Sequence, residues 1–226
     1  MKILGIETAT EICSAGIADC DVIVGEQWIN RRRAHAERLP GMIDRLLADT
    51  GVTPDELDGI AVSIGPGSFT GLRVGLSAAK GYAAAWQIPV IPVETLAALA
   101  QPVLQRGRRI IAGVGTRNRL LYAATYRWSQ KGPKREGEIY FGEPGKLPAA
   151  AHDVLCIGPA GDDVWRRFCR RSKQQAAEAL AWLHRPSGAA VALVGSQIGP
   201  AETADSWKTL EPLYMQGFPA RPPRRS

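Results

Sequence analysis

The stretch SIGPGSFTGL, residues 63–72, joins an apolar segment to a long helical segment and decides how the first half of the chain folds. The preceding residues have the continuous apolar character of a buried strand, and the residues that follow predict a helix from Phe69 to Trp86. Glycine-rich turns between a strand and a helix often hold phosphate groups at the helix N-terminus. The stretch therefore predicts either an anion-binding loop or a tight turn in which Ser68 or Thr70 caps the helix.

The helix predicted after this loop carries small residues at a spacing of four, namely Gly71, Gly75 and Ala79. A glycine inside a helix costs about 0.5–1 kcal/mol relative to alanine, so another contact must offset that cost. Residues four apart lie on one face of a helix, and a smooth face lets a second backbone approach closely. We therefore expect a docking stripe here, flanked by the larger side chains of Phe69, Leu72, Arg73, Leu76 and Lys80.

The rest of the first half predicts an α/β unit with a mixed sheet. Three strand-like segments within residues 2–30 are joined by short links, which favours antiparallel neighbours. An apolar helical face follows within residues 31–51, and Gly51 is placed to end that helix. Another strand and a further helix complete this half, and Thr95 is expected to cap that helix.

The basic link QRGRR, residues 105–109, is expected to separate two units. The first unit is expected to hold residues 1–105, and a smaller second unit residues 106–216. The second half again starts with a strand, a turn and a strand, and the polar run at residues 131–138 is expected to be a turn. A further strand and a mostly helical region follow. The Pro/Arg-rich tail, residues 217–226, is expected to be extended.

Charge is distributed unevenly along the chain, although the formal net charge is only +6. The first 105 residues carry a net charge of −4, whereas the remainder holds 20 Lys and Arg against 10 Asp and Glu, a net charge of +10. A basic half of this kind attracts nucleic acid or an acidic protein, or forms a solvated arginine-rich surface. The sequence has no aromatic-basic RNA-binding motif that would decide between these interpretations.

Composition and segment lengths are typical of a soluble globular protein. No apolar run reaches the roughly 18 residues that a membrane span needs, and the start MKILGIETAT lacks the pattern of a secretory signal. The four cysteines contain no CxxC pair, which argues against a metal or redox site and favours reduced thiols. We therefore expect a cytoplasmic protein without membrane attachment, whose mature chain starts at Met1.

Each half begins with two strands joined by a turn, and this duplication resembles the actin-like ATPase superfamily, also described as ASKHA or ribonuclease H-like. The resemblance implies an α/β protein of two actin-like subdomains, with mixed sheets flanked by helices and a reduced second subdomain. In that superfamily the first strand ends in an acidic-x-Gly-Thr turn that wraps a phosphate. Here the turn reads Glu7-Thr8-Ala9-Thr10, and the Cβ of Ala9 obstructs close backbone approach. We expect vestigial nucleotide or anion loops formed by Glu7, Thr8, Thr10, Gly65, Gly67, Ser68, Thr70 and Gly71.

A more specific resemblance is carried by four segments: ILGIETATEICSAGI, HAERLPGMIDRLL, SIGPGSFTGLRVGLSAAKG and EPLYMQ. Together they resemble the bacterial TsaB family, also called YeaZ, most strongly over residues 1–105. The resemblance implies a non-catalytic scaffolding partner of the related enzyme TsaD. With TsaD and the ATPase TsaE, such a protein serves in threonylcarbamoyl transfer to adenosine 37 of tRNA.

The resemblance also implies how such a protein assembles. TsaD is expected to pack against the two long helices, and the isolated chain is expected to use the same surface for a homodimer. The chain is expected to contact tRNA only as part of the complex. It is expected to bind no cofactor by itself, and a site for ATP or ADP at the interface with the partner stays open. The expected partner-binding residues are His35, Leu39, Met42, Ile43, Leu46, Leu47, Phe69, Leu72, Arg73, Gly75, Leu76, Ala79 and Lys80. Leu46→Glu or Gly75→Trp is expected to break association and leave the monomer folded.

The residues give little support to an enzyme that acts alone. TsaD-like enzymes bind a metal through two histidines four apart on the first long helix, whereas here His35 is followed four residues later by Leu39. We therefore expect no metal site. The residues give no support to the older description of the family as "glycoprotease-like". The sequence has no HExxH motif, and the segment around Ser68 is not a G-x-S-x-G elbow. Three alternatives stay open: an actin-fold ATPase or kinase, a glycoprotease-like peptidase, and an isolated RNA-binding module.

One position departs from the family pattern. Relatives usually end the first strand of the second unit with Asp-Ala-Arg, whereas this chain reads Gly115-Thr116-Arg117. The chain therefore lacks, at this position, an acidic side chain for a nucleotide or shared ligand.

Overall fold

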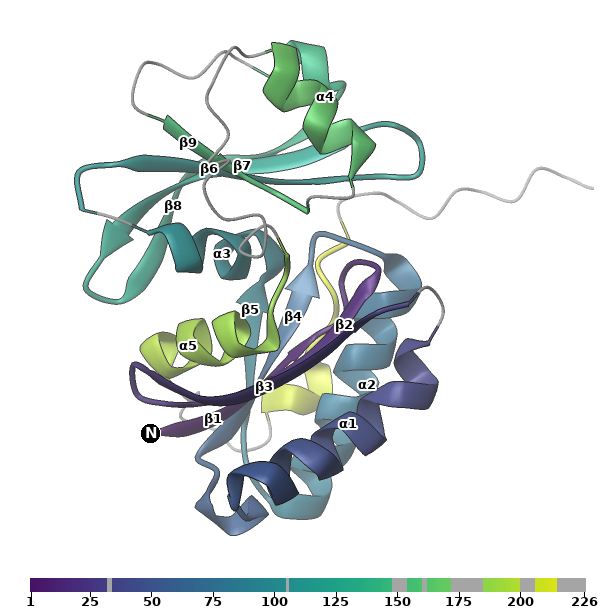
Figure 1. The fold of residues 1–226 in the computed structure, drawn as a ribbon, viewed down its shortest axis with the longest axis vertical. Helices are drawn as coiled ribbons and strands as arrows, with labels where there is room; N and C mark the ends of the chain where they lie inside the picture. Colours follow the sequence, from purple (N-terminus) through teal and green to yellow (C-terminus); the bar gives the residue numbers. More distant parts are fainter. Residues whose placement is uncertain are drawn as a thin grey trace, which may run out of the picture.

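Two mixed sheets, each flanked by helices, make up the computed structural model of this chain (Figure 1). The structure describes residues 1–31, 34–104, 106–147, 154–159, 162–171, 185–199 and 206–214. The prediction of an α/β protein with two mixed sheets is confirmed. The extended tail predicted for residues 217–226 lies outside the described residues.

The first lobe is built from three antiparallel strands followed by alternating helices and strands, as the sequence predicts. Its elements are β1 (Lys2–Glu7), β2 (Ile12–Asp19), β3 (Val22–Asn30), α1 (His35–Thr50), η1 (Pro54–Glu56), β4 (Gly59–Gly65), α2 (Phe69–Trp86), β5 (Val90–Glu94), α3 (Thr95–Ala100) and η2 (Gln101–Val103). The strand order is β3-β2-β1-β4-β5, and β4 is parallel to both β1 and β5. The helices α1 and α2 supply the crossovers that such parallel pairing requires.

The second lobe repeats the opening strand–turn–strand pattern and then adds a parallel strand. Its elements are β6 (Arg109–Gly115), β7 (Leu121–Ser129), β8 (Gly132–Gly142), η3 (Pro144–Lys146), β9 (Val154–Ile157) and α4 (Asp163–Arg171), and its strand order is β8-β7-β6-β9. The turn expected at residues 131–138 is wrong, because the tight connection lies at residues 130–131 and β8 already starts at Gly132. This part of β8 is polar because several of its side chains, such as Lys134 and Glu138, face solvent.

The chain then returns to the first lobe, which the sequence did not predict. Helix α5 (Gly188–Ile198) packs on the face of the first sheet opposite to α1 and α2 (Figure 1). Its approach is close, since a Cβ on Gly5 of β1 would lie 2.1 Å from the carbonyl oxygen of Gly188. The short helix η5 (Ser206–Thr209) also contacts this lobe. Placing all of residues 106–216 in a second unit does not describe this return, because α5 buries its apolar residues against the first sheet.

The first sheet therefore has a core on each face, and α3 contributes to the core of the second lobe. The expectation that Thr95 caps α3 is wrong, because Thr95 is the first residue within the helix. Its hydroxyl is buried without a hydrogen-bond partner among the described residues. Within that described part of the chain, no helix is both long enough and apolar enough to cross a membrane.

Candidate functional site

Two loops at one end of the first sheet pack directly against each other. One follows β1 and the other, within the stretch at residues 63–72, precedes α2. The Ser68 N–H donates to the Ala9 carbonyl over 2.6 Å. A Cβ on Gly67 would lie only 2.5 Å from that same carbonyl oxygen. The glycine-rich stretch therefore allows close contact with the chain's own β1–β2 loop.

The small-residue stripe on α2 faces the same loop. A Cβ added to Gly71 would lie 2.0 Å from the Thr8 carbonyl oxygen. A Cβ added to Gly75 would lie 2.2 Å from the Thr8 hydroxyl oxygen. The Thr8 hydroxyl also donates to the Gly71 carbonyl over 2.9 Å, and Ala79 is fully buried. The β1–β2 loop of this chain therefore packs against the stripe at Thr8. Gly75→Trp would for that reason disturb the monomer itself and not an interface alone.

Glu7 ends β1 beneath these loops and is fully buried. Its carboxylate accepts a hydrogen bond from the Ala9 N–H over 2.6 Å and another from the Ser63 hydroxyl. Burial raises the pKa of Glu7 to about 7, while the hydrogen bonds from Ser63 and Ala9 act in the opposite direction. Both carboxylate oxygens of Glu7 are thus engaged by hydrogen-bond donors of the chain itself.

These residues do not fit a metal-nucleotide cradle. Glu7 and Thr8 are enclosed by their own lobe. The carbonyl and Cβ of Ala9 fill the space beside Gly67, where a phosphate would need open backbone N–H groups. The first turn is therefore closed by protein atoms.

The other residues of the predicted anion loops have structural partners or face solvent. The Ser68 hydroxyl accepts the Gly71 N–H over 3.2 Å and caps α2, as the sequence predicts. The Thr10 hydroxyl accepts the Ile12 N–H over 3.2 Å. Gly65 is buried at a φ of 118°, whereas Thr70 is exposed on the first turn of α2.

His35 begins α1 and ties that helix to the β1–β2 loop. Its Nε2 lies 3.0 Å from the Thr10 carbonyl oxygen, which accepts a hydrogen bond when this nitrogen carries the proton. Leu39, one turn further, is fully buried in the core. Across the described residues, no three His, Cys, Asp or Glu side chains gather as metal ligands.

Gly115, which stands where relatives have an aspartate, lies against an aspartate from another part of the second lobe. The Gly115 N–H donates to the carboxylate of Asp162, which also accepts the N–H groups of Val164 and Trp165 over 2.9 and 3.1 Å. A Cβ on Gly115 would lie 2.3 Å from an Asp162 oxygen. Asp162 therefore sits at the start of α4 and fills the space that an aspartate at position 115 would need.

An apolar groove of about 460 Å³ opens to solvent between α1 and α2. Most of its surface comes from small and apolar side chains. The residues that line it are Ala36, Leu39, Pro40, Phe69, Thr70, Arg73, Val74, Ser77 and Ala78. Sequence reasoning named Leu39, Phe69 and Arg73 as contact residues. It missed the others because helical periodicity marks the apolar face of each helix and not the seam between two helices.

Phe69, Arg73 and Tyr214 form an aromatic–cation cluster at the groove. The ring centroids of Phe69 and Tyr214 are 5.0 Å apart, and the Arg73 guanidinium carbon lies 4.1 Å from the Phe69 centroid. The Nε of Arg73 donates to the Tyr214 hydroxyl over 3.0 Å. Phe69 is 40% exposed and Tyr214 is 36% exposed, so the cluster leaves aromatic surface open to solvent. Tyr214 lies within the EPLYMQ segment, but the sequence assigned no contact to it.

The remaining residues expected at a partner surface differ in how deeply they are buried. Met42 and Leu47 are half-buried beside the core, and the Nζ of Lys80 donates to the Lys208 carbonyl over 3.3 Å. The buried members are His35, Leu39, Ile43, Leu46, Leu72, Gly75, Leu76 and Ala79. Leu46 is only 2% exposed, so the expectation that Leu46→Glu leaves the monomer folded is wrong.

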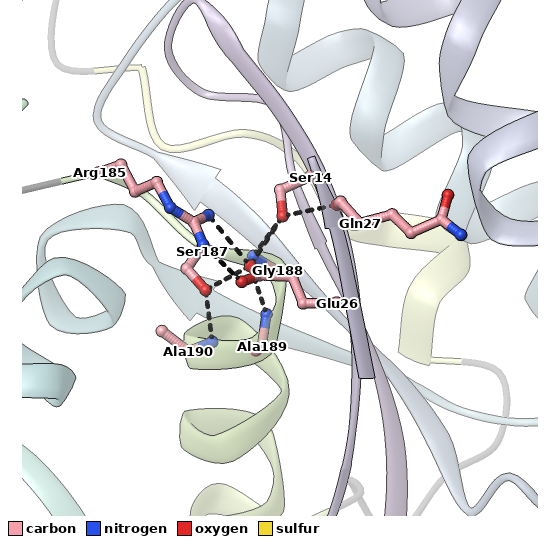
Figure 2. A network of polar contacts seen from close by, with 8 residues as sticks. All are labelled: Ser14, Glu26, Gln27, Arg185, Ser187, Gly188, Ala189 and Ala190. Carbon is pink, nitrogen blue, oxygen red and sulfur yellow. Dashed lines mark hydrogen bonds and ion pairs between the residues drawn. The ribbon is translucent and has the colours of Figure 1, made fainter. Parts of the chain in front are cut away.

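A polar network that the sequence did not predict fixes the start of α5 (Figure 2). Glu26 on β3 accepts hydrogen bonds from the hydroxyls of Ser14 and Ser187 and from the Arg185 guanidinium, the last over 2.8 Å. Burial acts to raise the pKa of Glu26, but the bonds from Arg185, Ser187 and Ser14 outweigh it and lower the pKa. No local pattern marks this network, because Glu26 and Arg185 are 159 positions apart.

Known sequences match about half of this chain. The sequence model of the family described as "TsaD: tRNA N6-adenosine threonylcarbamoyltransferase" matches residues 23–142, just over half of the chain. The tRNA threonylcarbamoyladenosine biosynthesis protein TsaB of Haemophilus influenzae is 36% identical over 127 residues, which cover 54% of this chain and 52% of that protein. Its namesake from Escherichia coli is 34% identical over 134 residues, 58% of each chain. The chain thus spans about half the length of the curated relatives it matches.

A solved structure matches both lobes. The protein described as "YeaZ from Pseudomonas aeruginosa" has a TM-score of 0.77 and 27% sequence identity, over 95% of this chain and 99% of that chain. The agreement extends beyond residue 105, where the sequence resemblance is thin. The two helix-flanked mixed sheets are accordingly consistent with a two-subdomain actin-like fold. On the matching family model, the relatives and this structure, the chain belongs to the TsaB (YeaZ) family.

Proposed function

We propose that this chain is a non-catalytic scaffolding subunit in the biosynthesis of threonylcarbamoyladenosine in tRNA. It binds a TsaD-type transferase, acts together with TsaE, and supports threonylcarbamoyl transfer to adenosine 37 in the cytoplasm. The observation that carries the proposal is the open apolar groove between α1 and α2. An apolar groove with an exposed aromatic residue at its edge suits a helix of a protein partner.

The relation between this chain and the transferase family supports the same surface. The TsaD family model matches residues 23–142, a region that contains both helices of the groove. Two chains that share these helices can pair through equivalent faces, much as the subunits of a symmetric dimer do. A homodimer of the isolated chain would use the groove in the same way, and the transferase would then compete with the second copy.

The loops and the contact made by His35 support a scaffold over an enzyme that acts alone. Glu7 is enclosed by Ser63 and the Ala9 N–H, so it is not placed to hold a cation. His35 is committed to the Thr10 carbonyl, and Ser68 caps α2. In our proposal the chain binds no cofactor by itself, and ATP or ADP binds only where the partner completes a site.

Reconstitution of tRNA modification from purified components tests the proposal. The components are this chain, the TsaD-type and TsaE-type proteins of the same organism, a source of threonylcarbamoyl-adenylate, and unmodified tRNA. We expect modification only when this chain is present, and negligible ATP hydrolysis by the chain alone. Full modification without the chain, or rapid ATP hydrolysis by it alone, would contradict the scaffold function.

Ser77→Arg tests the groove itself. Ser77 is exposed and lines the groove, so an arginine there places a charged, bulky side chain where a partner must pack. Ala85 is exposed on the same helix but does not line the groove, which makes Ala85→Arg the matched control. We expect Ser77→Arg to weaken binding to the transferase at least about tenfold, or roughly 1.4 kcal/mol, in calorimetric titrations. Unchanged affinity with Ser77→Arg would mean that the partner uses another face.

A further inference from the structure

One end of the second sheet, where β6 starts, β7 ends and β8 starts, gathers positive charge. We call this region the cationic sheet end. Its residues are Arg106, Arg108, Arg109, Arg127, Lys131 and Lys134, all of them exposed. The concentration of cations here is one source of the net charge of +10 beyond residue 105.

Strand register places three of these cations side by side. Arg109 on β6 is directly opposite Arg127 on β7, and Arg127 is directly opposite Lys134 on β8. Directly paired residues share one face of a sheet, so the three side chains form a row about 10 Å long across strands spaced roughly 4.8 Å apart. Like charges placed directly opposite one another destabilise a sheet. Such a row therefore needs negative charge beside it, from the protein or from a ligand.

One carboxylate offsets part of this repulsion. Glu136 on β8 forms ion pairs with the Nε atoms of both Arg109, at 3.0 Å, and Arg127. Arg108, Lys131 and Lys134 form no ion pair with any of the described residues. The cationic sheet end therefore keeps a surplus of positive charge that faces solvent.

An aromatic side chain extends this region to the opposite face of the sheet. The Arg106 guanidinium carbon lies 4.3 Å from the centroid of the Trp128 ring. Trp128 follows Arg127 on β7, so it points to the opposite face, and it remains 36% exposed. Cations combined with an exposed aromatic ring are the usual means of holding a nucleic-acid strand without reading its sequence.

From this arrangement we infer that the cationic sheet end binds the phosphate backbone of tRNA directly. The inference rests on the proposed function for the identity of the RNA, while the exposed cations and the strand register supply the binding surface. Lysine and arginine contacts to phosphates position an RNA and carry no base specificity. The surface therefore holds tRNA for the transferase and leaves recognition of the target adenosine to the partner.

A salt titration of RNA binding by this chain alone tests the inference. The probe is a fluorescently labelled, unmodified tRNA transcript with adenosine at position 37, and fluorescence anisotropy gives the affinity. The test variant is Arg108→Gln/Lys134→Gln, which leaves the Glu136 ion pairs in place. The matched control is Arg117→Gln/Lys146→Gln, which removes one arginine and one lysine at the other end of the same sheet. Circular dichroism checks that both variants are folded.

We expect the test variant to weaken tRNA binding roughly tenfold for each lost phosphate contact at 0.1 M salt. The slope of log affinity against log salt should fall by about one for each contact. The control should bind within about twofold of the original chain. Equal weakening in both variants would mean that binding follows net charge alone, and no weakening in the test variant would mean that RNA does not use this end. Either result overturns the inference.

This test is separate from the test of the proposed function. If the chain binds tRNA through the cationic sheet end but is not needed for modification, the scaffold function is contradicted and the RNA-binding surface stands. If the chain is needed for modification but the test variant still binds tRNA normally, the RNA-binding surface is contradicted and the scaffold function stands.

Discussion

At the residue scale, Glu7 shows how an acidic position of an actin-like fold is put to structural use. Its carboxylate links the Ala9 N–H of one loop to the Ser63 hydroxyl of the neighbouring strand. The group is fully buried, and burial raises its pKa to about 7. A titratable group enclosed in this way makes the stability of the first lobe depend on pH.

Glu7→Gln is expected to stabilise the chain at pH 8 and to alter the pH dependence of unfolding. The folded-state pKa of about 7 lies above the ordinary value of 4.5, so the folded state binds this proton more tightly than the unfolded state. The stabilising contribution is complete below about pH 4.5 and is lost as the pH rises through 7. Glutamine is neutral throughout, so the variant should gain on the order of 1–3 kcal/mol at pH 8.

Urea denaturation between pH 5 and pH 8 measures this difference. Glu37→Gln is the control, because Glu37 is an exposed carboxylate on α1. Its unfolding profile should run parallel to that of the original chain, whereas the Glu7→Gln profile should diverge upward with rising pH. Parallel profiles for all three proteins would mean that Glu7 is not a buried ionisable group.

At the scale of the element, α2 has glycines with opposite consequences. A Cβ on Gly71 would lie 2.0 Å from the Thr8 carbonyl oxygen, whereas a Cβ on Gly81 would meet nothing within 4 Å. Gly71→Ala should therefore destabilise the chain by about 1–3 kcal/mol through overpacking. Gly81→Ala should stabilise it by up to about 1 kcal/mol, because alanine has the higher helix propensity. Equilibrium unfolding of the two variants compares the same substitution on the same helix, and unchanged stability of Gly71→Ala would contradict the close approach of Thr8.

The same helix shows how much of the fold and the site the sequence could predict. The bounds of α2, Phe69 to Trp86, follow from local signals, because the Ser68 cap and the helical pattern lie within the segment. The occupant of its small-residue face is Thr8, 63 positions from Gly71, and no local signal reveals that pairing. The sequence therefore identified a surface for close approach but assigned it to another protein.

Elements with unusual surroundings escaped prediction for related reasons. The first part of β8 is polar and partly exposed, so it lacks the alternation that marks a half-buried strand. Helix α5, with the sequence GAAVALVGSQI, is small and apolar on most sides because it is buried against the first sheet. It therefore lacks the polar face that marks an amphipathic helix. The groove between α1 and α2 likewise depends on how the two helices cross, which periodicity along each one does not encode.

At the scale of the whole molecule, the return of the chain to the first lobe makes the two lobes interdependent. The elements from β6 to α4 form the second lobe, and α5 then covers the first sheet on the face opposite the groove. The Glu26 carboxylate holds the start of α5 through Arg185, Ser187 and the Ala189 N–H (Figure 2). Arg185 also lies over the Trp28 ring at 4.7 Å. This one network therefore connects the edge strand β3 to a helix that arrives only after the second lobe.

Arg185→Met is expected to loosen α5 and to destabilise the chain by about 2–4 kcal/mol, because it leaves a largely buried carboxylate without its cation. Hydrogen exchange should rise at the amides of α5 more than at those of α2, and urea denaturation should give the loss in stability. Lys2→Met is the control, since it removes the Lys2–Glu56 pair from a more exposed position and should leave stability nearly unchanged. A double variant, Glu26→Met/Arg185→Met, should recover part of the loss, because it no longer buries an unpaired charge. If α5 exchanged no faster in Arg185→Met than in Lys2→Met, apolar packing alone would hold the helix, and Glu26 would not be the tie between the sheet and the returning chain.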